Sequence, residues 1–104
     1  ITGDGTQERD FIHVDDVVSA IVTLLEDPKA VGTYNLASGE MYTIAEIADM
    51  FNRKSKTPVS VVFLPQAHGF VKSLRADTSK LTREYAWRPK HRVSATITRA
   101  VMHR

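Results

Sequence analysis

The stretch that most constrains this chain is residues 3–16, which reads Gly-Asp-Gly-Thr-Gln-Glu-Arg-Asp-Phe-Ile-His-Val-Asp-Asp. Its opening Gly-Asp-Gly predicts a tight turn, because glycine tolerates positive φ and the Asp side chain accepts nearby backbone N–H groups. Three apolar, β-prone residues then indicate a short extended segment: Phe11, Ile12 and Val14. Asp15 and Asp16 come before a helical pattern, where their carboxylates would accept free backbone N–H groups and complement the helix dipole. The order is therefore turn, short strand, helix.

Helical periodicity predicts four helices in all. The first spans residues 15–26 and stops where Pro28 disfavours helical geometry at Asp27. The second begins with a capping box, in which Thr43 accepts a backbone N–H and Glu46 reaches back. It carries four apolar residues at helical spacing: Ile44, Ile47, Ala48 and Phe51.

The two remaining helices lie in the C-terminal third. Asp77 is expected to cap a helix that runs through Leu81 and closes near Trp87. The last helix is marked by four apolar residues, with Ser94 as its expected cap: Val93, Ile97, Ala100 and Val101. Trp87 and Tyr85 are interpreted as side chains that fill the core.

Two further strands complete the expected fold. A short one covers residues 33–36, and a longer one covers residues 58–65, which are β-branched, apolar and bracketed by prolines. The longer run is typical of a buried strand. Residues 66–75 show no period and are expected to form a loop. The fold class predicted from these patterns is a small mixed α/β domain of about four helices and three short strands, spanning residues 1–104.

Composition restricts the classes of function. The chain has 104 residues and no cysteine, which excludes disulfides and cysteine nucleophiles and suits a cytoplasmic location. A net charge of +2 is too small to indicate a nucleic-acid binder. The longest nearly apolar stretch, Val17–Leu25, is far shorter than the roughly 20 residues of a membrane span. We therefore expect neither nucleic acid nor membrane as a partner.

No catalytic or metal-ligating set is visible in the sequence. Gly3 and Gly5 do not continue into a dinucleotide fingerprint, because position 8 is Glu. No tyrosine is followed four residues later by lysine. The histidines are scattered without metal-ligand spacing: His13, His68, His91 and His103. The sequence alone thus indicates a chain that is not catalytic by itself and binds no metal.

Arg9 allows two interpretations. It could form a structural ion pair with Asp10, Asp15 or Glu8 on a solvated loop. Alternatively, it could hold a phosphate or carboxylate, helped by Gln7, because a guanidinium presents paired donors to two oxygens. The residues alone leave both open.

The Gly-Asp-Gly-Thr-Gln-x-Arg-Asp-Phe-Ile-His-Val-Asp-Asp stretch resembles the segment that opens the substrate lobe of the NAD-dependent epimerase/dehydratase family, which are extended short-chain dehydrogenases. UDP-glucose 4-epimerase and dTDP-glucose 4,6-dehydratase are members. Three more blocks agree in order: Gly-Thr-Tyr-Asn-Leu-Ala-Ser-Gly at 32–39 with Thr-Ile-x-Glu at 43–46, Ala-Asp-Thr-Ser-Lys at 76–80, and Trp-Arg-Pro at 87–89. The resemblance spans nearly the whole chain.

The resemblance implies roles for particular residues. Arg9 matches the arginine that contacts the diphosphate of the nucleotide sugar, and Thr43 matches a small polar position near the nucleotide. The family commonly has a second arginine before the Ala-Asp-x-Ser-Lys block. Here the chain offers His68, Lys72 or Arg75 in its place.

The resemblance also implies what lies outside the chain. It covers the C-terminal lobe of UDP-galactose 4-epimerase-type enzymes, without the N-terminal Rossmann domain that would bind NAD and carry the Ser/Thr–Tyr–Lys group. In such an enzyme bound NAD transiently oxidises the hexose at C4. The chain is thus expected to bind the nucleotide sugar and no cofactor of its own. The alternative is a non-catalytic interaction domain, whose exposed apolar patch would favour a homodimer.

Overall fold

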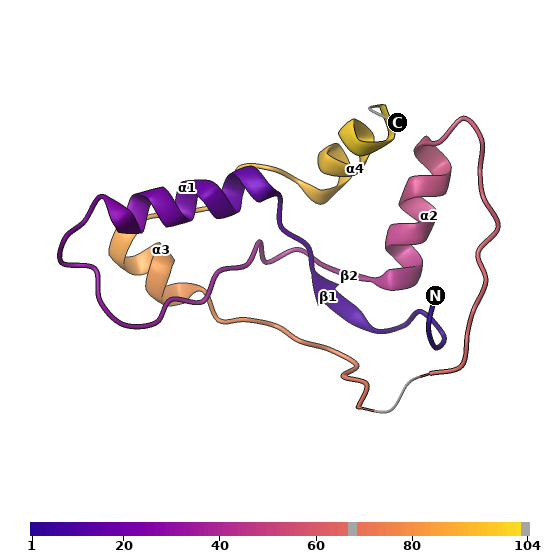
Figure 1. Ribbon diagram of the computed structural model, residues 1–104, viewed down its shortest axis with the longest axis horizontal. Coiled ribbons are helices and arrows are strands. Elements are labelled where there is room, and N and C mark those ends of the chain that lie inside the picture. Colours follow the sequence, from indigo (N-terminus) through magenta and orange to yellow (C-terminus); the bar gives the residue numbers. More distant parts are fainter. Residues whose placement is uncertain (67–68, 103–104) are drawn as a thin grey trace.

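The computed structural model describes residues 1–66 and 69–102. Along the chain it forms four helices and a two-stranded sheet (Figure 1): β1 (Glu8–Asp10), α1 (Val14–Leu25), β2 (Met41–Thr43), α2 (Ile44–Lys54), α3 (Ser79–Tyr85) and α4 (Val93–Met102). The expected count of four helices is confirmed. Within the described residues no helix is long and apolar enough to cross a membrane.

The sheet is small and central. Strands β1 and β2 pair antiparallel, with Arg9 opposite Tyr42. The predicted turn precedes β1: Gly3 and Gly5 have φ of +82° and +78°, and Asp4 Oδ1 accepts the backbone N–H of Thr6 at 3.0 Å. In Figure 1 this sheet lies between α1 and α3 at one end and α2 and α4 at the other.

Helix α1 begins one residue earlier than expected, and its cap differs. The N-cap residue is His13, whose Nδ1 accepts the backbone N–H of Asp15 at 2.9 Å. The prediction that Asp15 and Asp16 cap this helix is therefore wrong. Asp16 instead turns toward the segment after α3, where its carboxylate accepts the backbone N–H groups of Lys90 and His91.

Helix α2 has the capping box that the sequence predicts. The Thr43 hydroxyl accepts the N–H of Glu46 at 3.0 Å, and the Glu46 carboxylate accepts the N–H of Thr43 at 3.4 Å. Helix α2 packs on α4, where Lys54 Nζ donates to the Ser94 carbonyl at 2.8 Å. Ser94 lies inside α4 rather than at its cap, so that expectation is wrong.

The core lies between α1 and α3. Ala20, Leu81 and Trp87 are buried together, and the Trp87 indole N–H donates to the Ser19 hydroxyl at 2.9 Å. Trp87 therefore fills the core as predicted. The residue that precedes α3 is Thr78, which makes no side-chain cap, so the expected Asp77 cap is displaced by one position. Asp77 still accepts the N–H of Ser79 at 2.9 Å.

The expected strands are largely wrong. Residues 11–14, 33–36 and 58–65 form no strand beyond a single bridge between Thr2 and Leu64, and β2 was not expected. The run 58–65 is exposed rather than buried. A strand needs neighbours to supply its hydrogen bonds, and for the run 58–65 the described residues supply only residues 1–3 as backbone partners.

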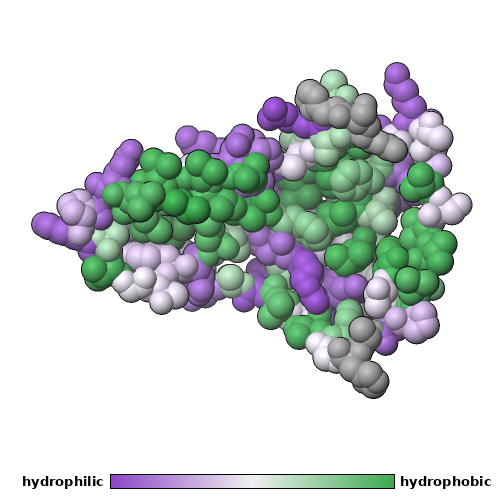
Figure 2. Space-filling view, in the orientation of Figure 1, coloured by the Kyte–Doolittle hydropathy of each residue, from purple (hydrophilic) through white to green (hydrophobic). Residues whose placement is uncertain are grey.

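Much of α1 also faces solvent, although its high content of β-branched residues would lead one to expect tertiary burial to hold the helix. Figure 2 shows an apolar band along this helix, and its exposed members are Val14, Val18, Ile21, Val22 and Leu25. The Cα radius of gyration is 16.4 Å, whereas a compact domain of this length has about 13 Å. The described structure is thus extended and leaves an apolar helix face without a covering layer.

Candidate functional site

Arg9 lies at the middle of β1, and its side chain is half-buried. The guanidinium is held by main-chain carbonyls: Nη1 donates to Glu8 at 2.7 Å and to Lys72 at 3.4 Å, and Nη2 donates to Val71. Within residues 1–66 and 69–102 it makes no ion pair with an acidic side chain. The ion pair considered from the sequence is therefore not what positions Arg9.

The carbonyls leave one edge of this guanidinium free. A guanidinium has five N–H groups, and three are used, two on Nη1 and one on Nη2. The Nε–H and the second Nη2–H have no hydrogen-bond partner in the described part of the chain. Nε–H and Nη2–H groups can together bind two oxygens of a phosphate or carboxylate. Arg9 is thus held by main-chain carbonyls with its Nε–H unpaired among the described residues.

A hollow of about 380 Å³ lies beside Arg9. Its lining also includes Arg75, and the remaining residues are mostly apolar: Asp10, Ile12, Leu36, Ala37, Leu74 and Ala76. The Asp10 carboxylate is already occupied, because it accepts the N–H groups of Ser38 at 2.8 Å and Gly39 at 2.7 Å. Two arginines therefore line a single hollow whose acidic side chain is bonded to Ser38 and Gly39.

The other predicted site residues do not line this hollow. Gln7 is buried, donates from Nε2 to the Thr2 carbonyl at 3.2 Å, and leaves its Oε1 without a partner among the described residues. Thr43 is occupied as the cap of α2. His68 falls outside the described residues. The structure thus brings together Arg9 and Arg75 and places Gln7 and Thr43 elsewhere.

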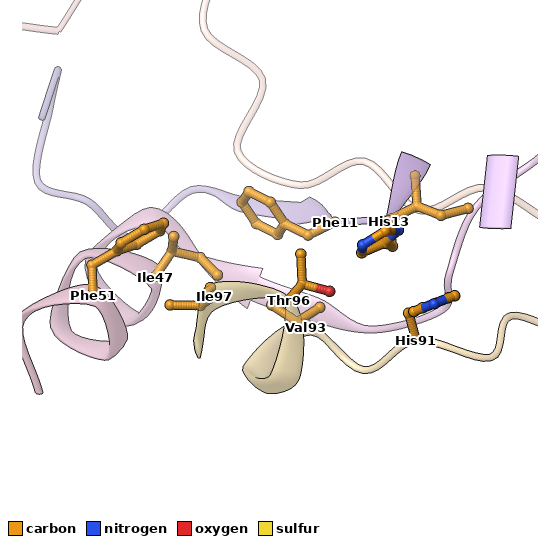
Figure 3. A pocket seen from close by; sticks show the side chains of 9 residues that line it. Phe11, His13, Ile47, Phe51, His91, Val93, Thr96 and Ile97 are labelled. Carbon is orange, nitrogen blue, oxygen red and sulfur yellow. The ribbon is translucent and has the colours of Figure 1, made fainter. Parts of the chain in front are cut away.

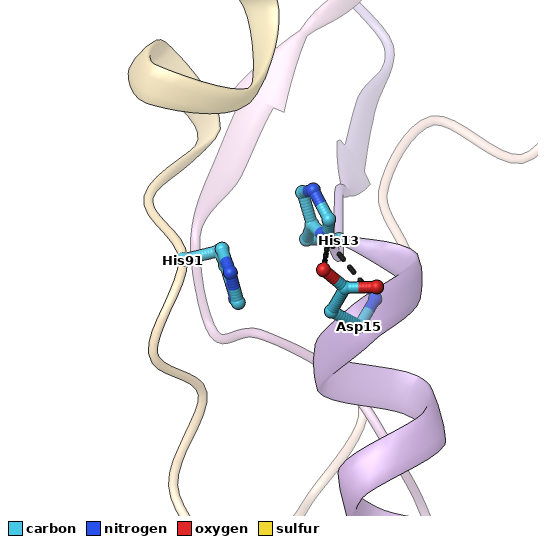
Figure 4. Close-up of side chains that lie close together, drawn as sticks. All are labelled: His13, Asp15 and His91. Carbon is cyan, nitrogen blue, oxygen red and sulfur yellow. Dashed lines mark hydrogen bonds and ion pairs between the residues drawn. The ribbon is translucent and has the colours of Figure 1, made fainter. Parts of the chain in front are cut away.

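A second cluster was missed from the sequence. His13 and His91 stack with ring centroids 4.2 Å apart and an interplanar angle of 17°. Asp15 lies against the His13 ring (Figure 4). The two histidines are remote in sequence, so only the fold could bring them together.

The His13–His91 stack is anchored by a buried carboxylate. Asp16 Oδ1 lies 2.9 Å from His91 Nδ1, and the Asp16 side chain is 2% exposed. Burial raises the pKa of Asp16, but hydrogen bonds from the Lys90 and His91 backbone and from the His91 ring outweigh it, and the net pKa is lowered. This carboxylate thus joins the start of α1 to the segment before α4.

The donor set of His13, Asp15 and His91 is close enough to suggest a cation site, since one ligand atom from each lies within 4.8 Å of the others. The ring geometry argues against it. Imidazole lone pairs lie in the ring plane, and two nearly parallel planes about 4 Å apart cannot both contain one ion at metal–nitrogen distances of about 2 Å. The His13 Nδ1 also accepts the Asp15 N–H. We therefore interpret the cluster as structural.

A pocket of about 230 Å³ adjoins this stack (Figure 3). His13 and His91 lie at one end of it. The rest of its wall is almost entirely apolar and comes from the β1–α1 junction, α2 and α4: Phe11, Ile12, Ile47, Phe51, Val93, Thr96 and Ile97. This pocket offers no charged group to fix the orientation of a polar ligand. The hollow beside Arg9 is therefore the better candidate for an anionic ligand.

Comparison with known proteins agrees with the sequence motif around Arg9. Residues 1–44 match the model of the NAD dependent epimerase/dehydratase family. UDP-arabinose 4-epimerase 1 of Arabidopsis thaliana is 33% identical over 92 residues, which are 86% of this chain and 22% of that protein. UDP-glucose 4-epimerase of Corynebacterium glutamicum is 33% identical over 98 residues, 92% of this chain and 30% of that protein.

The chain matches a fragment of the enzymes of this epimerase/dehydratase family. Among solved structures, UDP-glucuronic acid 4-epimerase from Bacillus cereus, in complex with UDP-glucuronic acid and NAD, is 31% identical. Its TM-score is 0.84 over 93% of this chain and 32% of that one. UDP-glucose 4-epimerase from Bifidobacterium longum, in complex with NAD⁺ and UDP, is 26% identical, with a TM-score of 0.82 over 94% of this chain and 30% of that one.

The chain spans between a fifth and a third of the length of these relatives. Arg9, Gln7 and Thr43 lie within the 44 residues that match the family model, and Arg75 lies outside them. The motif thus predicts Arg9 as a site residue, whereas its orientation by the Val71 and Lys72 carbonyls is visible only in the fold.

Proposed function

We propose that the chain is the nucleotide-sugar-binding part of an NAD-dependent sugar-nucleotide epimerase or dehydratase and is not catalytic alone. One observation carries the proposal. The Arg9 guanidinium is held by the Val71 and Lys72 carbonyls, its Nε–H has no partner among the described residues, and Arg9 and Arg75 line the same hollow.

The chemistry of this hollow suits a nucleoside diphosphate. A diphosphate offers paired anionic oxygens, which the free Nε and Nη2 edge of Arg9 can bind in bidentate fashion. Arg75 adds a second positive charge on the same hollow. The apolar walls from Ile12, Leu36 and Leu74 can contact the uncharged parts of such a ligand. Solved relatives bound to UDP-glucuronic acid or UDP support this ligand class.

The described residues do not fit NAD. The dinucleotide fingerprint needs a Gly-rich turn between a strand and a helix of a parallel βαβ unit, and the strands described here form an antiparallel pair. The turn at Gly3 and Gly5 is followed by β1, not by a helix. NAD, which is present in solved relatives, would therefore be held by another part of the enzyme, which would also supply the oxidation and reduction at the sugar.

Calorimetric titration of UDP-glucose into the gene product that contains this sequence tests the proposal. Arg9→Gln removes the paired donors, and we expect the dissociation constant to rise about tenfold to a hundredfold, as for a lost charge-assisted hydrogen bond. Arg99→Gln is the matched control, because Arg99 is exposed on α4 and away from the hollow. Equal weakening by both variants, or none by Arg9→Gln, would remove Arg9 from the site.

A second candidate, a non-catalytic interaction domain, is favoured by the apolar band on α1. Contiguous exposed apolar patches mark interaction surfaces, and Leu25 and Val18 are 78% and 50% exposed. Light scattering across a range of protein concentration tests self-association. An association that Val18→Lys abolishes would support this candidate, and a monomer at every concentration would dismiss it.

A further inference from the structure

Residues 60–64 have one edge that pairs with residues 1–3, while the Val59 N–H and C=O are bonded to the Asn52 side chain at 3.0 Å. Leu64 donates its N–H to the Ile1 carbonyl at 2.6 Å and accepts the N–H of Gly3 at 2.7 Å, and Val62 accepts the terminal amine of Ile1 at 2.7 Å. Because backbone groups alternate sides along an extended chain, those of Val61 and Phe63 point away from residues 1–3. We call the N–H and C=O groups of Val61 and Phe63 the outer edge. These groups make no hydrogen bond in the described part of the chain.

The side chains of this segment are also exposed. Val59, Val62 and Leu64 are 63%, 62% and 57% exposed. Val61 and Phe63 are 39% and 54% exposed, and the Phe63 ring lies near Gly5, where an added Cβ would lie 3.2 Å from Cε1 of Phe63. A β-prone apolar run with an open hydrogen-bonding edge is a template for pairing with another strand.

The sequence of this run fits a central strand better than an edge. Edge strands of soluble proteins usually carry charges or a proline within the strand, whereas Val-Ser-Val-Val-Phe-Leu at 59–64 has neither. Nearly continuous apolar runs are typical of strands covered on both faces. The composition therefore suits a strand that has another strand on each side and packing against both faces. In the described structure this segment pairs with residues 1–3 alone.

We infer that the outer edge accepts a β-strand from another part of the same enzyme. The chain covers 32% and 30% of two solved relatives, so roughly two thirds of such an enzyme lies outside the match. The added strand would bond to the N–H and C=O groups of Val61 and Phe63. It would place residues 59–64 between itself and residues 1–3. This inference rests on the family match and not on the nucleotide-sugar site.

Amide hydrogen exchange, measured by NMR on the full-length gene product that contains this sequence, tests the strand. We expect the amides of Val61 and Phe63 to exchange at least a hundredfold more slowly than unstructured references, as the Leu64 amide should. Exchange of Val61 and Phe63 at unstructured rates, with Leu64 protected, would overturn the inference. Protection that increases with protein concentration would assign the edge to a second copy and would equally overturn it.

A pair of proline variants gives an independent readout. Val61→Pro removes an outer-edge N–H, so the full-length product should lose its Val61 and Phe63 ladder and unfold at a lower temperature. Lys56→Pro is the matched control in the same connection, because the preceding Ser55 already has φ −85° and ψ 140°, which suit a residue before proline. Equal unfolding temperatures for the two variants would contradict the inference. If the Val61 and Phe63 amides are protected but UDP-glucose does not bind, the result counts against the proposed nucleotide-sugar site and not against the added strand.

Discussion

The inner face of α1 and the 59–64 segment are both rich in aliphatic side chains, but they are held in different ways. On α1, Ala20 packs with Leu81 and Trp87, and Asp16 ties the helix to the residues before α4. The 59–64 segment is joined to its neighbours mainly through backbone hydrogen bonds to residues 1–3. An aliphatic sequence is therefore buried on the inner face of α1, where α3 covers it. It is exposed at residues 59–64, where no described element covers it.

The largest expected effect separates these two regions directly. Leu81→Ala removes a side chain that is 1% exposed and should lower the free energy of unfolding by about 2–5 kcal/mol, through lost burial and a residual cavity. In the 104-residue chain, Leu64→Ala makes the same chemical change at a side chain that is 57% exposed and should cost under about 1 kcal/mol. Urea unfolding measures both. Equal costs would refute the distinction between the two regions.

Asp16 gives the next largest effect. Asp16→Asn replaces a buried acceptor of the Lys90 and His91 N–H groups and should cost about 1–3 kcal/mol near neutral pH. The folded-state pKa of Asp16 is lowered from 3.8, so its stabilisation is complete above that value and is lost as the pH falls through the lower folded value. Unfolding free energies measured from pH 7 to pH 2 should converge for the two proteins at the acid end. A constant difference would contradict the assignment.

A smaller effect resolves the role of Thr43. Thr43→Ala should lower the unfolding free energy by about 1 kcal/mol, as loss of an N-cap does, and Thr43→Ser should restore most of it. If capping is its entire role, UDP-glucose affinity should be unchanged in both variants. Weaker binding by Thr43→Ala at unchanged stability would instead place Thr43 at the nucleotide.

Local signals in the sequence predicted the parts of the fold that local forces determine. The helix expected at 15–26 forms at Val14–Leu25, and the capping box at Thr43 and Glu46 is present. These features depend on residues within a few positions of one another. The predicted cap of α1 was wrong because the Asp16 carboxylate accepts backbone N–H groups 74 and 75 residues later. No local sequence pattern reveals these distant donors.

The strands, the orientation of Arg9 and the His13–His91 stack depend on contacts between residues that are distant in sequence. The strand expected at 58–65 has β propensity, but among the described residues its only backbone ladder contacts are with residues 1–3, and propensity alone does not make a strand. The motif predicted Arg9, yet its orientation comes from carbonyls 62 and 63 residues away. The His13–His91 stack could not be foreseen for the same reason.

The central claim is that the free edge of Arg9 binds the diphosphate of a nucleotide sugar. The most direct measurement is the ¹⁵N-resolved NMR signal of the Arg9 Nε–H during titration with UDP, with uridine as the ligand that lacks phosphate. We predict that UDP shifts and sharpens this signal, because the Nε–H gains an anionic acceptor, and that uridine leaves it unchanged. A signal that stays fixed while UDP perturbs other residues would contradict the account.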